Sequence, residues 1–299
     1  MKSQGFTLKD VDELCINASL FLKESGALMN TAIAKYDGYN PANNSIAAND
    51  YLEYKNKDAV DTVYYSTYIK LETATEHLVL LLKGYENPVV SIPTWANVRA
   101  ILELCGLISW VLDPSLTIQT RINRVYSIRY HDISEHLKLL NVEPSNRQAI
   151  SLVEQRLQKV KNDAVSLGCP TITNKNGKID GIGERYPNYI NLVRDALGRE
   201  REYRLSSGAI HGSDIALNQL GYEGGIVAPD QEGIVHLEKI VNPNFPMYQL
   251  QISISAISQC IWYRWRLLGW GDDEIIHFLD SSFDRMKFDD SYRVWRNTH

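Results

Sequence analysis

An arginine and a histidine carry the most specific chemical pattern in this chain of 299 residues. Arg204 and His211 lie in residues 201–212, a stretch that predicts one helix closed by a glycine. Seven residues make almost two helical turns, so the guanidinium and the imidazole are expected on one face, with Tyr203 and Ser207 nearby. A guanidinium offers phosphate a planar fork of donors, and an imidazole exchanges protons near neutral pH. The pair therefore suits phosphodiester chemistry.

The same pattern resembles the Arg-x(4 to 6)-His signature of the HEPN superfamily, helical proteins that include many metal-independent RNases of toxin, CRISPR and phage-defence systems. The run from Tyr203 to Ser207, followed by His211, is also similar to that of a little-characterised bacterial HEPN-like branch. In that branch an earlier helix often carries an Arg-(x)3-Glu motif followed by Trp and Asp-Pro. The residues that match it here are Arg99, Glu103, Trp110, Asp113 and Pro114. The resemblance covers about residues 88–135 and 185–220.

The resemblance implies an all-α, HEPN-like antiparallel helical bundle that cleaves RNA without a metal or cofactor. In this mechanism the RNA 2'-hydroxyl attacks the adjacent phosphorus, which gives a 2',3'-cyclic phosphate and a 5'-hydroxyl. His211 would be the general base or acid, and Arg204 would stabilise the transition-state charge. Supporting roles fall to Tyr203 and Ser207, which orient the histidine or bind phosphate, and to Arg99 and Glu103, which brace the site. Because one histidine per chain is little for both proton transfers, a homodimer or larger assembly is part of this hypothesis.

Two other interpretations use the same residues without catalysis. One is a non-catalytic binding, sensor or assembly subunit of a bacterial defence operon, with an operon-encoded protein partner. The formal net charge of −5 and the apolar Leu205 beside Arg204 favour it. The other is a small-ligand pocket lined by Tyr203, Arg204 and His211. A structural alternative for Arg204 is a buried clamp to a carboxylate such as Glu103 that holds two helices together.

A second basic tract lies earlier in the chain, where no acidic residue occurs between Leu116 and His131. It contains Arg121, Arg124 and Arg129 together with Tyr126 and Tyr130. Arginines can follow an RNA backbone and tyrosines can stack on its bases, so the tract is a candidate RNA-binding surface. An equally weighted alternative is a solvated helix face whose arginines pair with Glu135 or Glu143.

Composition and the absence of other motifs argue against several further classes of function. With 44% apolar and 22% charged residues the chain is ordinary for a globular protein, and the acidic balance argues against indiscriminate nucleic-acid binding. The four cysteines are scattered and no histidine has metal-ligand spacing, so reduced thiols and no metal site are expected. No Gly-rich phosphate loop or nucleophile elbow is present. Without an expected signal peptide or membrane span, the prediction is a cytoplasmic protein.

Apolar periodicity predicts one helical domain over residues 1–299, divided into an N-terminal helical hairpin (1–87), a HEPN-like core (88–221), a loop or small β-hairpin (222–241) and C-terminal helices (242–299). A cluster of aromatic residues near Trp262 is expected to pack in the core. Loops are expected at 36–45 and 168–183, where turn-forming residues are dense. The predicted helices span residues 7–35, 57–83, 93–112, 117–140, 145–167, 188–197, 199–211, 246–268 and 272–285.

Overall fold

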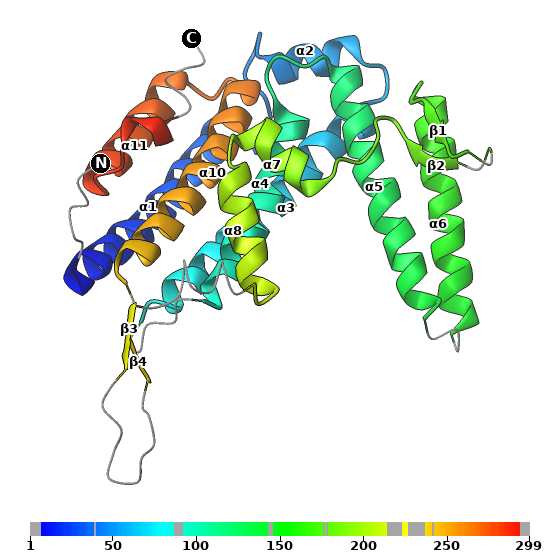
Figure 1. Cartoon of the computed structure of the whole chain (residues 1–299). Coiled ribbons are helices and arrows are strands. Elements are labelled where there is room, and N and C mark those ends of the chain that lie inside the picture. The colour runs from blue at the N-terminus through cyan, green and yellow to red at the C-terminus, as the bar shows by residue number, and fades with distance from the viewer. Residues whose placement is uncertain are drawn as a thin grey trace.

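The computed structural model of the chain describes residues 7–38, 40–86, 92–142, 146–175, 177, 179–213, 223–226, 237–240 and 242–293. These residues form a predominantly helical protein with two small antiparallel hairpins, which confirms the all-α prediction (Figure 1). The helices are α1 (Leu8–Lys35), α2 (Ile46–Glu53), α3 (Lys57–Lys83), α4 (Thr94–Leu112), α5 (Ile118–Leu140), α6 (Arg147–Ser166), α7 (Tyr189–Leu197), α8 (Glu200–Ile210), α10 (Asn244–Leu268) and α11 (Asp272–Arg285).

Helix α4 is the centre of the core. It packs against α3, α10, α7 and α8, and its apolar side chains are buried in contact with them. The helix begins after Pro93 and ends at Asp113, as the sequence predicts. By length and composition α4 meets the requirements of a membrane span, which the sequence analysis did not expect, but 61% of its most apolar stretch is buried inside the protein. That burial is the environment of a core helix and is compatible with a soluble protein.

The expected helix termini and core residues are confirmed where their signals are strongest. The Thr7 hydroxyl accepts from the Asp10 backbone N–H while the Asp10 side chain accepts from Thr7, which forms a capping box at the start of α1. Trp262 and Trp265 of α10 are buried, together with Trp270, so the aromatic cluster packs in the core as predicted. All four cysteines are free thiols.

Helices α5 and α6 pack side by side and form an arm beside the rest of the bundle (Figure 1). A hairpin of β1 (Thr171–Thr173) and β2 (Ile179–Ile182) lies against this arm, where the sequence predicted only a loop. The hairpin approaches α5 so closely that a Cβ at Gly183 would lie 2.0 Å from the Asn123 carbonyl oxygen. Gly183 also has a φ of +71°, so glycine is required there on two grounds.

Two further short segments lie outside the predicted helices. Helix α2 was not predicted; the Ser45 hydroxyl caps it by accepting from the Ala48 backbone N–H, and Asp50 is buried on its inner face. The second hairpin pairs β3 (Glu223–Ile226) with β4 (Leu237–Ile240), so a hairpin occurs within residues 222–241.

Candidate functional site

One carboxylate, Glu103, links the predicted motif residues of α4 and α8. Arg99 and Glu103 lie four residues apart on α4 and therefore share a face, and the Arg99 Nε donates to Glu103 Oε1 at 2.8 Å. Tyr203 on α8 is buried against α4, and its hydroxyl donates to the same oxygen at 2.8 Å. Glu103 thus fixes the guanidinium and the phenol relative to each other.

His211 meets this cluster at the end of α8. It is the C-cap residue, it is exposed, and Gly212 follows with a φ of +69° that ends the helix. Its Nε2 lies 3.4 Å from Nη1 of Arg99, which is 112 positions earlier in the chain. A guanidinium only donates hydrogen bonds, so Nε2 must accept and the imidazole proton is on Nδ1. The contact therefore places a ring nitrogen of His211 next to a guanidinium that Glu103 holds in place.

The electrostatics of the cluster keep its donors protonated. Burial, together with the hydrogen bond to Glu103, raises the pKa of Tyr203 to about 12. The hydrogen bond to Glu103 also raises the pKa of Arg99, whose guanidinium lies 5.4 Å from the centre of the Tyr203 ring. Tyr203 is therefore a neutral donor and Arg99 a permanent cation at neutral pH.

Arg204 lies on the solvent side of α8. Its side chain is 60% exposed, and its Nε and Nη2 donate to Glu200 Oε1 at 2.9 and 2.8 Å. The proposed buried clamp between Arg204 and Glu103 is wrong, because Arg99 and Tyr203 occupy that carboxylate. Ser207 is partly buried one turn after Tyr203. The structure thus brings Arg99, Glu103, Tyr203 and His211 together and leaves Arg204 at the surface of the same helix.

The second basic tract does not form the expected RNA-binding surface at Arg121. This side chain is fully buried, and its Nη1 donates to Asp50 Oδ2 at 2.8 Å. The Tyr64 hydroxyl donates to the same oxygen at 2.8 Å. Burial raises the pKa of Asp50, while the neighbouring Arg121 acts in the opposite direction. Arg121 cannot contact a nucleic acid in this position, so it is a structural residue.

The side chains of Arg124, Arg129 and Tyr130 make contacts within the protein. Arg124 donates to Glu184 at 3.0 Å and to the Trp110 carbonyl at 2.6 Å, and not to Glu135; the other expected partner, Glu143, lies outside the described residues. The Arg129 guanidinium lies 5.2 Å from the centre of the Tyr126 ring. The Tyr130 hydroxyl donates to the Ile179 carbonyl at 3.3 Å and holds β2 against α5. Arg124 and Arg129 are partly exposed. An RNA-contacting surface that includes these two arginines, without Arg121, therefore stays a prediction.

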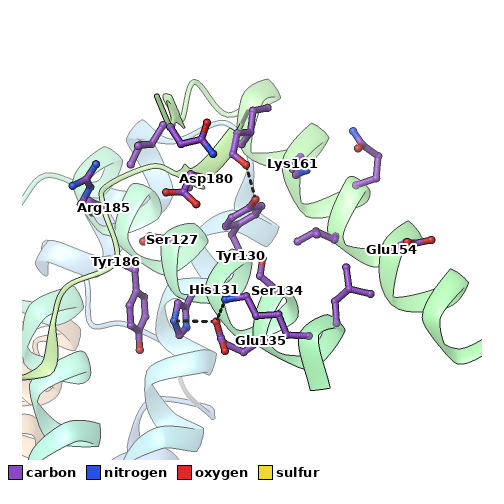
Figure 2. A pocket seen from close by; sticks show the side chains of 18 of the residues that line it. Ser127, Tyr130, His131, Ser134, Glu135, Glu154, Lys161, Asp180, Arg185 and Tyr186 are labelled. Carbon is purple, nitrogen blue, oxygen red and sulfur yellow. Dashed lines mark hydrogen bonds and ion pairs between the residues drawn. The ribbon is translucent and has the colours of Figure 1, made fainter. Parts of the chain in front are cut away.

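A cleft that the sequence did not reveal lies between α5, α6 and the β1–β2 hairpin (Figure 2). Its volume is about 1100 Å³, and Tyr130 lines it, whereas Arg121, Arg124 and Arg129 do not. At one end the rings of His131 and Tyr186 stack with centroids 3.7 Å apart. The Tyr186 and Tyr189 hydroxyls are 2.7 Å apart, which connects this end to α7. The cleft residues come from several separate segments between Ser127 and Tyr186 and have no common motif, so only the fold could identify them.

Within the described ranges, no group of three or more His, Cys, Asp or Glu side chains could hold a metal ion. Comparison of the chain with protein-family models, with curated proteins and with solved structures found no match. The geometry of the α4–α8 cluster is therefore the basis for a functional assignment.

Proposed function

We propose that the protein is a metal-independent endoribonuclease of a bacterial defence or toxin-type system, acting in the cytoplasm. The observation that carries this proposal is the 3.4 Å contact between Nη1 of Arg99 and Nε2 of His211 at the protein surface. A base and a cation in contact at an exposed site meet the two needs of RNA transesterification, proton removal and charge stabilisation.

In the proposed reaction His211 takes the proton from a ribose 2'-hydroxyl. The 2'-oxygen then forms a bond to the adjacent phosphorus, and the bond from phosphorus to the 5'-oxygen breaks. The leaving 5'-oxygen receives a proton, which gives a 2',3'-cyclic phosphate and a 5'-hydroxyl. Since a single imidazole would have to serve as base and acid in turn, a second His211 from a homodimer is the preferred proton donor.

The arginines would stabilise the additional negative charge on the phosphoryl oxygens. Arg99 is held by Glu103 and by the face of Tyr203, which turns its Nη1 edge toward His211. A phosphate bound at that edge would replace His211 as the acceptor and free Nε2 for proton transfer. Arg204, which is 60% exposed, would approach from the solvent side after exchanging Glu200 for phosphate.

The decisive experiment measures cleavage of single-stranded RNA by the wild type and by His211→Ala, Arg204→Ala and Arg99→Ala. Removal of a general base or of a charge-stabilising cation is expected to reduce cleavage by about 10²–10⁴-fold. The exposed His277 on α11 provides a matched control, and His277→Ala should cleave like the wild type. His211→Ala and Arg204→Ala should leave the melting temperature nearly unchanged because both residues are exposed. Cleavage that persists in His211→Ala would refute the mechanism.

A second candidate is a non-catalytic binding, sensor or assembly subunit. It is favoured by the pairing of each motif arginine with its own carboxylate, Arg99 with Glu103 and Arg204 with Glu200, which leaves little net charge at the site. Under this hypothesis no variant changes RNA cleavage, and His211→Ala weakens binding of a protein partner. Overexpression separates the two candidates: toxicity of the wild type that is lost in His211→Ala supports the nuclease.

A further inference from the structure

We propose that the α5–α6 cleft binds a nucleotide unit, either free or as part of an RNA strand. The base would stack at the His131–Tyr186 end, and the phosphate would be held by Lys161 and Arg185. This site is separate from the Arg99–His211 contact, and its occupancy does not depend on cleavage there. A cleft of about 1100 Å³ is at the upper end of small-molecule sites, which is large enough for one nucleotide with room for a neighbour.

The aromatic residues of the cleft provide a stacking surface. The rings of His131 and Tyr186 are nearly parallel, with 4° between their planes, so they form a stacked pair at this end of the cleft to which a base would add. Figure 2 shows His131 between Tyr186 and Glu135, at the mouth formed by α5. The His131 side chain is 35% exposed and therefore accessible. Nucleobases stack on such rings with little dependence on sequence.

The cations of the cleft come from different walls. Lys161 lies on α6, with its ammonium 5.6 Å from the centre of the Tyr130 ring, and Arg185 lies in the segment between β2 and α7 (Figure 2). In the described part of the chain, neither has a carboxylate within ion-pair distance. Lys138, the remaining basic residue of the lining, is paired with Glu135 at 2.6 Å. Lys161 and Arg185 are therefore the cations on which a phosphate would be bound.

The acids of the cleft restrict the ligand. Asp180 and Glu154 line it together with the two unpaired cations, so the lining has no net charge that would attract a polyphosphate. Carboxylates accept hydrogen bonds from exocyclic amines and ribose hydroxyls. A ligand with one phosphate, several hydroxyls and an amino-bearing base therefore matches both signs of charge. Adenine and cytosine nucleotides fit this description better than uracil nucleotides.

Two polar atoms in the floor of the cleft also indicate a polar ligand. Ser134 Oγ and His131 Nδ1 are buried and have no hydrogen-bond partner among the described residues, and the nearest carboxylate oxygen to His131 Nδ1, Oδ1 of Asp132, lies 3.7 Å away. Both residues line the cleft. Buried polar atoms in native proteins nearly always have a partner, and ribose hydroxyls, which both donate and accept, would supply one.

Titration calorimetry on the full chain with 5'-AMP tests the site. We expect binding by the wild type that is weakened about tenfold in Lys161→Ala and in Arg185→Ala, since each loses one charge-assisted contact. The matched control is Lys159→Ala, because Lys159 lies two residues from Lys161 on α6 and pairs with Asp163 in solvent. Ribose 5-phosphate, which has no base, and 5'-UMP, which has no exocyclic amine, should both bind more weakly than 5'-AMP.

A short oligoadenylate of about ten nucleotides distinguishes the two sources of the ligand. If it binds more tightly than 5'-AMP and is weakened by the same two substitutions, the natural ligand is RNA; if 5'-AMP binds at least as tightly, it is a free nucleotide. The proposal is overturned if neither probe binds, or if Lys161→Ala and Arg185→Ala bind like the wild type. Because binding is measured without cleavage, and is expected to persist in His211→Ala, failure of the nuclease proposal would leave this result intact.

Discussion

The protein contains two clusters with the same composition, an arginine, a carboxylate and a tyrosine, in opposite environments. In the α2–α3–α5 cluster Arg121, Asp50 and Tyr64 are buried. In the α4–α8 cluster Arg99 and Glu103 keep about a quarter of their side-chain surface in solvent, and His211 stands beside them. The same three residue types can therefore stabilise the packing of helices where they are buried, or form a candidate reactive site where solvent reaches them.

Arg121→Ala should have the largest effect on stability. It leaves Asp50 as an unpaired buried carboxylate, and breaking a buried ion pair typically costs about 3–5 kcal/mol. Arg99→Ala, in contrast, should cost about 1 kcal/mol because water can reach Glu103. Urea denaturation of both variants measures the difference. Equal losses of unfolding free energy would show that exposure does not separate the two clusters.

The destabilisation by Arg121→Ala should also depend on pH. Burial raises the folded-state pKa of Asp50, and Arg121 opposes that rise, so removing Arg121 moves the pKa further up. A carboxyl group with a raised folded-state pKa contributes stability at low pH that is lost as pH rises through that pKa. Arg121→Ala should therefore be less destabilised at about pH 5 than at about pH 7.5.

Denaturation at both pH values, with the exposed Lys159→Ala as the control, measures this effect. A destabilisation that is as large at low pH as at neutral pH would mean that Asp50 does not carry the buried charge. The unfolded state contributes equally to both variants, so the comparison depends on the folded-state environment of Asp50.

Glu200→Gln should have the smallest effect on stability, and it tests whether Arg204 contributes to RNA binding. The Glu200–Arg204 pair lies at the surface at i,i+4 spacing, so its loss should change the unfolding free energy by no more than about 0.5 kcal/mol. Release of Arg204 should strengthen binding of single-stranded RNA about two- to fivefold, measured by fluorescence anisotropy. Asp163→Asn removes the acid of another exposed i,i+4 pair and controls for the change in net charge. Equal affinities of the two variants would remove Arg204 from the RNA-binding surface.

The structural features that the sequence predicted are those set by residues close together in the chain. Periodicity predicted the long helices, and the resemblance singled out Arg99 and Glu103, which pair on one face of α4. Sequence periodicity did not predict α2, which is too short to show a helical period. It also did not predict the β1–β2 hairpin, because the short Thr-Ile-Thr strand lies among turn-forming residues.

The missed features of the candidate site depend on distant residues. That Arg99, rather than Arg204, meets His211 depends on how α4 and α8 are rotated against each other. The burial of Arg121 depends on Asp50, 71 positions away. Local spacing limits which side chains share a face, but it does not determine what that face contacts.

The short helix α2 makes the N-terminal segment an obligatory part of the folded protein. A truncated chain that began at α3 would lose Asp50, and Arg121 would be left in the interior without its counterion. Such a chain is expected to aggregate or to be degraded, so the region from α4 to α8 should not be excised for biochemical work without its first two helices.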